Sequence, residues 1–209
     1  MKNRLLTIDD LYNYFLSINQ NVTFSSKSES QNLVIQIPGN IQFSTNNKDI
    51  EGLMPVRLWS CHILKNRNGS NITEKSMKNA LSSFLNRPIL GYIHEVDGEP
   101  HFYSHNMHMD EDNNIVYDEF PVGVIPESGN PHLEYDDKYD KNYVVVDGYI
   151  FEEYSKAAEI LHREEECSVS VELSIRELSY DAAEKVLNLD DFYFSGVTIL
   201  GCDEDGNLI

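Results

Sequence analysis

Basic residues are few in this chain. Lysine and arginine together number 16, against 35 aspartate and glutamate residues, so the formal net charge is −19 and the isoelectric point is about 4.6. The phosphates of nucleic acids and anionic membrane surfaces would repel such a protein, and we expect neither as a partner. Basic segments of another protein would be attracted.

Cysteine is scarce and long apolar runs are missing. The three cysteines, Cys61, Cys167 and Cys202, form no close-spaced pair, which favours reduced thiols in a cytoplasmic setting over a disulfide framework. No stretch reaches the ~20 apolar residues of a membrane helix, and the N-terminus lacks the apolar segment of a secretory signal. Without internal repeats or low-complexity linkers, 209 residues predict one compact domain.

Four segments have helical character. Thr7 and Thr73 are candidate N-cap residues, each followed by acidic residues and apolar side chains at helical spacing. The predicted helices span residues 7–18, 73–87, 153–161 and 180–187. Residues 1–52 are predicted to form an N-terminal helix and a hairpin, turned at residues 38–40, that pack as an extension on a body of residues 53–209.

The other apolar segments predict about eight strands. Proline and glycine within residues 119–126 are typical of a strand with a bend or bulge. Because regular strand–helix–strand units are few, we expect an α+β fold with a curved antiparallel sheet or barrel.

One strand, residues 167–174, alternates polar and apolar side chains without a break. Such alternation places Ser168, Ser170, Glu172 and Ser174 on one face and Val169, Val171 and Leu173 on the other. The simplest interpretation is a strand with one face on the core and one in water. The alternative is a site, since a serine on a rigid strand and a distant histidine can form a nucleophile and its base.

Four of the seven histidines fall between residues 94 and 108. His101, His105 and His108 would share a face only on a helix, and the proline and aromatic residues among them favour an extended segment. No zinc-binding pattern is present, so we expect no metal and no cofactor. One of these histidines could instead act as the general base for a serine, or all of them could be structural.

Six segments in order resemble the prohead (capsid-maturation) serine proteases of tailed phages, which are related in fold to the herpesvirus assemblins. They cover residues 53–201. The N-terminal 50 residues match less clearly. The segments are RPILGYI (87–93), FYSHN (102–106), PVGVIP (121–126), YVVVDGYI (143–150), VSVEL (169–173) and FSGVTILG (194–201).

The resemblance implies a mostly antiparallel β-barrel flanked by about four helices, like the herpesvirus protease, and an endopeptidase with Ser170 as nucleophile and His105 as base. Ser104 and Asn106 replace the usual glycine and aspartate beside that histidine. The third member is expected to be Glu172, with Asp191 as the alternative. Backbone amides near Gly196 are candidates for the oxyanion site.

The resemblance also implies partners and a location. The substrates would be scaffold and major capsid protein segments, cut inside the prohead in the cytoplasm of the host bacterium, with self-association as a further possibility. Two other hypotheses remain. One is a non-catalytic capsid assembly factor that uses its acidic surface, and the other is a metal-binding enzyme based on the histidine cluster.

Overall fold

The computed structural model describes residues 23–25, 32–44, 50–66, 69–109, 115–164, 166–181 and 186–201. In chain order the elements are β1 (Thr23–Ser25), β2 (Asn32–Phe43), β3 (Leu53–His62), β4 (Leu64–Lys65), β5 (Ser70–Ile72), α2 (Glu74–Ala80), the 3-10 helix η1 (Leu81–Phe84), β6 (Pro88–Gly91), β7 (Ile93–Val96), β8 (Glu99–Phe102), β9 (Met107–Met109), β10 (Ile115–Tyr117), β11 (Phe120–Val124), β12 (His132–Asp136), β13 (Lys141–Phe151), α3 (Ala157–Glu164), β14 (Glu166–Asp181) and β15 (Val186–Leu200).

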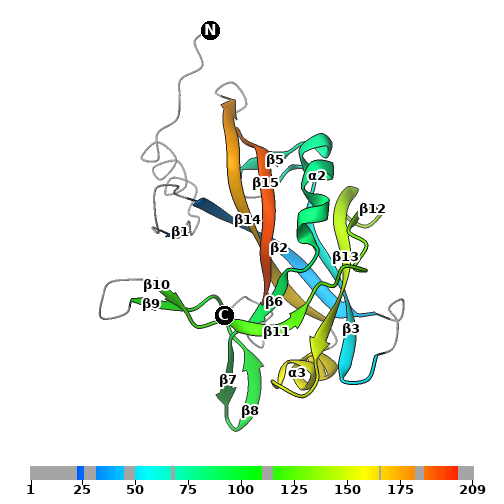
Figure 1. Cartoon of the computed structure of the whole chain (residues 1–209), viewed down its shortest axis with the longest axis vertical. Coiled ribbons are helices and arrows are strands. Elements are labelled where there is room, and N and C mark those ends of the chain that lie inside the picture. Colours follow the sequence, from blue (N-terminus) through cyan, green and yellow to red (C-terminus); the bar gives the residue numbers. More distant parts are fainter. Residues whose placement is uncertain are drawn as a thin grey trace.

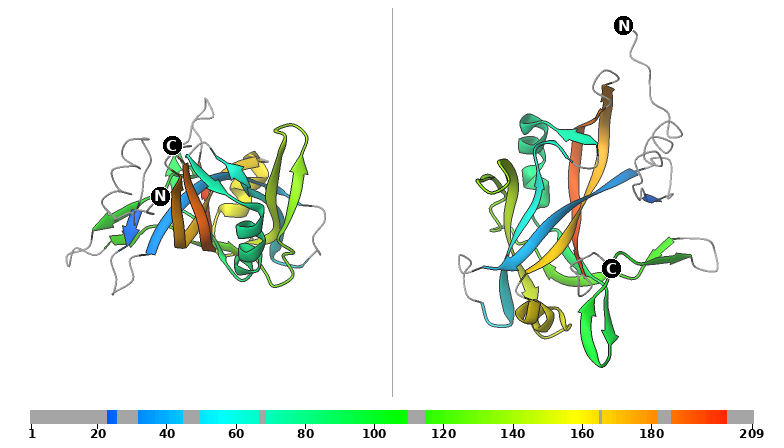
Figure 2. Two further views of the ribbon diagram at one scale, coloured as in Figure 1. Left: turned by 90° about the horizontal axis from the view of Figure 1, so that it is seen from above. Right: turned by 180° about the vertical axis from the view of Figure 1, so that it is seen from behind.

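The molecule is organised around β14 and β15, which run antiparallel to each other through its centre (Figure 1). On its other side β14 pairs with β2 over ten residues, and the view from behind shows β2 passing along it (Figure 2). β15 pairs in parallel with β5 and β6. β6 continues through β11 and β13 to β3, each pair being antiparallel.

The predicted architecture is wrong. The strands form a mixed sheet in which β15 has two parallel neighbours, rather than a mostly antiparallel barrel flanked by about four helices. The described residues contain two α-helices, α2 and α3, and both are short. No helix in the described part of the chain is long and apolar enough to cross a membrane.

The apolar face of β14 forms part of the core, as its alternation predicted. Val169, Val171 and Leu173 are fully buried there, and Val197 and Ile199 of β15 are buried with them. The opposite face is less exposed to solvent than the alternation alone suggests, since Ser170 is only 5% exposed and Ser174 only 4%. This face is therefore a covered polar surface inside the fold.

The predicted hairpin within residues 32–44 does not form. β2 is a single strand, and it pairs with β14, β1 and β3. At Gly39 a Cβ would lie 2.6 Å from the Trp59 carbonyl oxygen of β3, so glycine here serves close strand approach and not a turn. β2 is thus a strand of the main sheet.

The other local predictions had mixed outcomes. Thr73 does cap α2, because its hydroxyl accepts the Ser76 N–H at 3.1 Å. The helix predicted from residue 153 begins at Ala157. The helix predicted over residues 180–187 is wrong, since Tyr180 pairs with Leu187 across β14 and β15; cross-strand pairing overrides weak helical propensity. The N-terminal helix lies outside the described residues.

Two hairpins, β7–β8 and β9–β10, are not hydrogen-bonded into the main sheet and project from it (Figure 1). β9–β10 leads directly into β11, where the ladder register shifts between Pro121 and Gly123. This irregularity confirms the predicted bulge and bends the strand where the projecting hairpin joins the sheet.

Candidate functional site

The site lies on the polar face of β14. Ser170 stands directly opposite Thr198 of β15, so both side chains lie on the same side of the sheet. Glu172 lies two residues further along, and the Thr198 hydroxyl donates a 2.7 Å hydrogen bond to its Oε1. Thr198 is fully buried. The polar face is therefore ordered by a hydrogen bond between the two long strands.

Glycines allow the segment before His105 to pack closely against the end of β15. Phe102 is buried over Gly91, where a Cβ would lie 2.8 Å from its ring. At Gly201 a Cβ would lie only 1.8 Å from the Phe102 carbonyl oxygen. The Tyr103 N–H donates to the Tyr92 carbonyl at 2.9 Å, and the Tyr103 carbonyl accepts the Gly201 N–H at 3.2 Å. The chain is thus fixed two residues before His105.

His105 is bound to a buried carboxylate. Its Nδ1 lies 2.9 Å from Glu119 Oε1, with the two side chains 17% and 3% exposed. The same oxygen accepts the backbone N–H of Asn106 at 3.2 Å, and the Asn106 amide donates to Asp118 at 2.6 Å. Since a carboxylate only accepts, Nδ1 carries the proton, and Nε2 is the basic nitrogen of the neutral ring.

Two atoms of this pair are buried without a hydrogen-bond partner, His105 Nε2 and Glu119 Oε2. Buried polar atoms are nearly always paired in folded proteins. In general-base catalysis a carboxylate-bound imidazole presents its other nitrogen to the nucleophile. Here Nε2 makes no hydrogen bond with Ser170.

Glu172 is electrostatically linked to this pair. Burial raises the pKa of Glu172, while the Thr198 hydrogen bond and the charge of His105 lower it and Glu119 raises it further. The pKa of Tyr117, at the end of β10, is raised by burial and by the charges of Glu172 and Glu119. Glu172 and Tyr117 are therefore both electrostatically coupled to the His105–Glu119 pair or to its acid.

The structure brings only some of the predicted site residues together. His105 acts electrostatically on Glu172, but Glu119, which the sequence analysis did not single out, makes the contact with His105 Nδ1. Asp191 pairs with Glu177 and forms an exposed ion pair with Arg176 at 3.4 Å. It lies seven residues from Ser170 along the ladder, roughly 23 Å. Gly196 lies within β15 opposite Glu172, not in a loop.

Four other histidines contact neighbouring side chains, and one of them, His94, also has a buried Nε2 without a hydrogen-bond partner. His101 lies 3.7 Å from Glu164, and His108 lies 3.0 Å from Asp118. The ring of His94 packs on Tyr103 at 4.6 Å between centroids. His62 Nε2 contacts Lys141 at 2.9 Å. No three His, Cys, Asp or Glu side chains in the described ranges converge as metal ligands.

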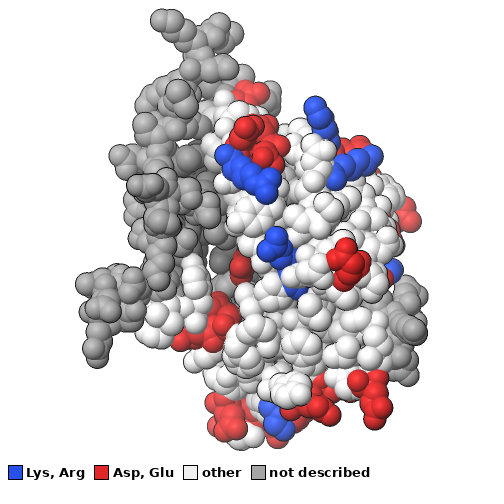
Figure 3. All heavy atoms as spheres, in the orientation of Figure 1, with Lys and Arg blue, Asp and Glu red and all other residues white. Residues whose placement is uncertain are grey.

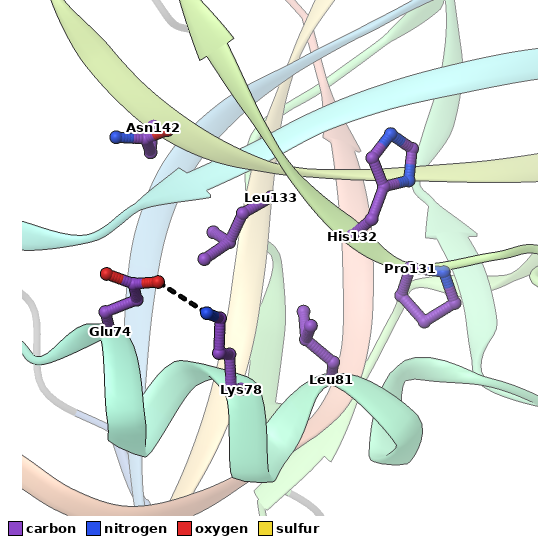
Figure 4. Close-up of a pocket in the computed structure, with 7 residues that line it drawn as sticks. All are labelled: Glu74, Lys78, Leu81, Pro131, His132, Leu133 and Asn142. Carbon is purple, nitrogen blue, oxygen red and sulfur yellow. Dashed lines mark ion pairs between the residues drawn. The ribbon is translucent and has the colours of Figure 1, made fainter.

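A pocket of about 430 Å³ lies between α2 and the β12 segment (Figure 4). An ion pair between Glu74 and Lys78 on the helix forms one wall, and His132 and Leu133 face it from β12. None of the predicted catalytic residues lines it. The pocket is therefore separate from the site around His105 and Glu119.

The family model for the YonD N-terminal domain matches residues 51–209. The chain belongs to this family. No curated protein and no solved structure matches it. The part matched to the YonD N-terminal domain begins just before β3 and includes His105, Glu119, Ser170 and Glu172. It does not include β2, although β2 pairs with both β3 and β14.

Proposed function

We propose that this chain is a serine endopeptidase in which Ser170 is the nucleophile, His105 the general base and Glu119 the acid that orients the imidazole. The substrates proposed are scaffold and capsid-protein segments of a tailed-phage prohead, because six segments of the chain resemble the prohead proteases. The identity of these substrates rests on that resemblance alone.

One observation carries the catalytic part of the proposal: His105 Nδ1 is bound to the buried carboxylate of Glu119 at 2.9 Å, and Nε2 is buried without a partner. The carboxylate fixes the tautomer and stabilises the imidazolium that forms when Nε2 accepts a proton. A purely structural histidine would more often use both ring nitrogens.

In the mechanism, His105 Nε2 accepts the Ser170 hydroxyl proton as Oγ attacks the scissile carbonyl carbon. The imidazolium then returns this proton to the leaving amine, and an acyl-enzyme ester remains on Ser170. His105 next removes a proton from water as the water oxygen attacks the ester carbonyl, and it returns this proton to Ser170 Oγ as the acyl group leaves as a carboxylic acid. Glu172, predicted as the third catalytic residue, accepts a hydrogen bond from Thr198 and in this proposal supports the imidazolium through its charge.

A serine-directed fluorophosphonate probe tests the proposal without knowledge of the substrate. Mass spectrometry should find the label on Ser170. Labelling should disappear in Ser170→Ala and His105→Ala, and it should persist in Ser168→Ala, which removes a hydroxyl from the same strand face. Label on Ser168 or on no serine, in a correctly folded protein, would rule out this nucleophile.

Co-expression with the scaffold and capsid proteins tests the biological reaction. Wild-type protein should shorten them, as judged by gels and by mass spectrometry of the cut ends, and Ser170→Ala should leave them intact.

A second candidate function is that of a non-catalytic assembly factor. The projecting hairpins β7–β8 and β9–β10 and the net charge of −19 favour it, since they offer docking surfaces for basic protein segments. Assembly that depends on the protein without any processing, together with no probe labelling, would favour this function over the protease.

A further inference from the structure

No lysine or arginine in the described ranges forms an ion pair with Glu172 or Glu119. The two charged groups that act on Glu172 do so in opposite directions, since His105 lowers its pKa and Glu119 raises it. Arg57, Arg163 and Arg176 form ion pairs with other acids. Figure 3 shows acidic side chains on the surface where the β9–β10 hairpin meets the body. A bound cation would complete the site.

Glu172 has one carboxylate oxygen in use and one that faces a glycine. Oε1 accepts the Thr198 hydroxyl. Oε2 lies 3.6 Å from the position that a Cβ would occupy at Gly196, and the side chains of Leu90 and Pro88 each lie 3.7 Å from that position. Two apolar side chains and a carboxylate oxygen therefore surround the face of Gly196. An aliphatic chain that ends in a cation, as in lysine or arginine, fits these neighbours.

The position of Glu172 along β14 relates this contact to the reaction. Glu172 lies two residues from Ser170 on the same strand face, about 7 Å away. A substrate side chain that reaches Glu172 would belong to a residue next to, or one removed from, the bond that Ser170 attacks. Glu119, whose charge acts on Glu172, has a buried Oε2 without a hydrogen-bond partner, and this is a separate sign that a donor is missing.

We propose that the site selects peptides with lysine or arginine beside the scissile bond, and that the carboxylate of Glu172 binds this cationic side chain. This inference rests on the proposed endopeptidase function. It assigns Glu172 to substrate selection and leaves the orientation of His105 to Glu119.

The test is a peptide library in which each position in turn holds lysine, norleucine or glutamate. Norleucine keeps the aliphatic chain of lysine without its charge. At one position next to the cleaved bond, wild type should cleave the lysine peptide about tenfold faster in kcat/KM than the norleucine peptide, which corresponds to about 1.4 kcal/mol. Glu172→Gln should bring this ratio close to one. The ratio is informative even if the variant is slower overall.

Gly196→Val is the second variant, because it places a side chain against Glu172 from the neighbouring strand without changing the charge. It should also reduce the preference for lysine. Equal cleavage of lysine and norleucine peptides by wild type would overturn the inference about Glu172, while the proposed endopeptidase function would be retained.

Binding separates the two proposals further. Ser170→Ala should bind the fluorescent lysine peptide about tenfold more tightly than the norleucine peptide, measured by anisotropy, and Ser170→Ala with Glu172→Gln should lose this difference. Charge-selective binding without any cleavage by wild type would contradict the protease and retain the cation site. If wild type does not cleave the peptides and Ser170→Ala does not bind them selectively, both proposals are rejected.

Discussion

The hydroxyl of Thr198 donates a 2.7 Å hydrogen bond to the carboxylate of Glu172 across the two longest strands of the sheet. Thr198 is fully buried, so Thr198→Val should leave an acceptor unsatisfied with little change in shape. We expect a loss of roughly 1–3 kcal/mol in the free energy of unfolding, measured by urea denaturation. Thr198→Ser keeps the hydroxyl, and a loss just as large in this control would point to packing and not to the hydrogen bond.

Glu172 should make stability depend on pH with a defined sign. Its folded-state pKa is raised by burial, so the folded protein binds this proton more tightly than the unfolded chain. Glu172 therefore costs no stability below its unfolded pKa of about 4.3, and the cost grows as pH rises through the folded-state pKa.

Comparison with Glu172→Gln isolates this effect from the other acids of the chain. Urea unfolding of both proteins from acid to neutral pH should show the variant gaining stability relative to wild type as pH rises, with a plateau above the folded-state pKa. A difference that stays constant over this range would refute the raised pKa.

Glu119→Gln should reduce activity far more than it changes the fold. Glutamine can accept from Nδ1 through its oxygen, but it does not stabilise the imidazolium. In a serine–histidine–acid site a comparable change lowers kcat by about 10⁴-fold. Peptide cleavage measures this effect, and circular dichroism checks the fold. Activity within a few-fold of wild type would show that Glu119 only stabilises the base of the β9–β10 hairpin and has no part in catalysis.

Gly201→Ala should displace the segment that carries His105. The added methyl would lie 1.8 Å from the Phe102 carbonyl oxygen, and backbone there must move, at a cost of about 1–3 kcal/mol. We expect a lower melting temperature together with weaker fluorophosphonate labelling. Gly196→Ala, whose methyl meets only ordinary contacts of 3.6 Å or more, should melt near wild type. Equal melting temperatures for both variants would contradict this role of Gly201.

Two cysteines should be unreactive in the folded protein. Cys61 and Cys167 are buried thiols that form no disulfide, and burial raises the pKa of the Cys61 thiol to about 12, so little thiolate forms there near neutral pH. In a Cys202→Ser variant, Ellman's reagent should detect no rapidly reacting thiol under native conditions and two in urea. Rapid native labelling of either cysteine would contradict their burial.

The sequence by itself determined the local features. Alternation identified the buried face of β14, the capping pattern identified Thr73, and proline with glycine identified the bulge in β11. Each of these depends on neighbours within a few residues, which the sequence contains directly. The same reasoning failed at β2 and at residues 180–187, where pairing with distant strands outweighed a turn-like tripeptide and a weak helical pattern.

Only the tertiary structure decided which acid meets His105. The chain has 35 acidic residues, and nothing in the residues around Glu119 distinguishes it from the others. Glu119 reaches His105 because the β9–β10 hairpin brings residues 106 and 118 together at its base, and because Gly201 lets the Phe102–Tyr103 backbone come close to the end of β15. Such contacts depend on the arrangement of strands that are far apart in the chain, so local sequence patterns do not encode them.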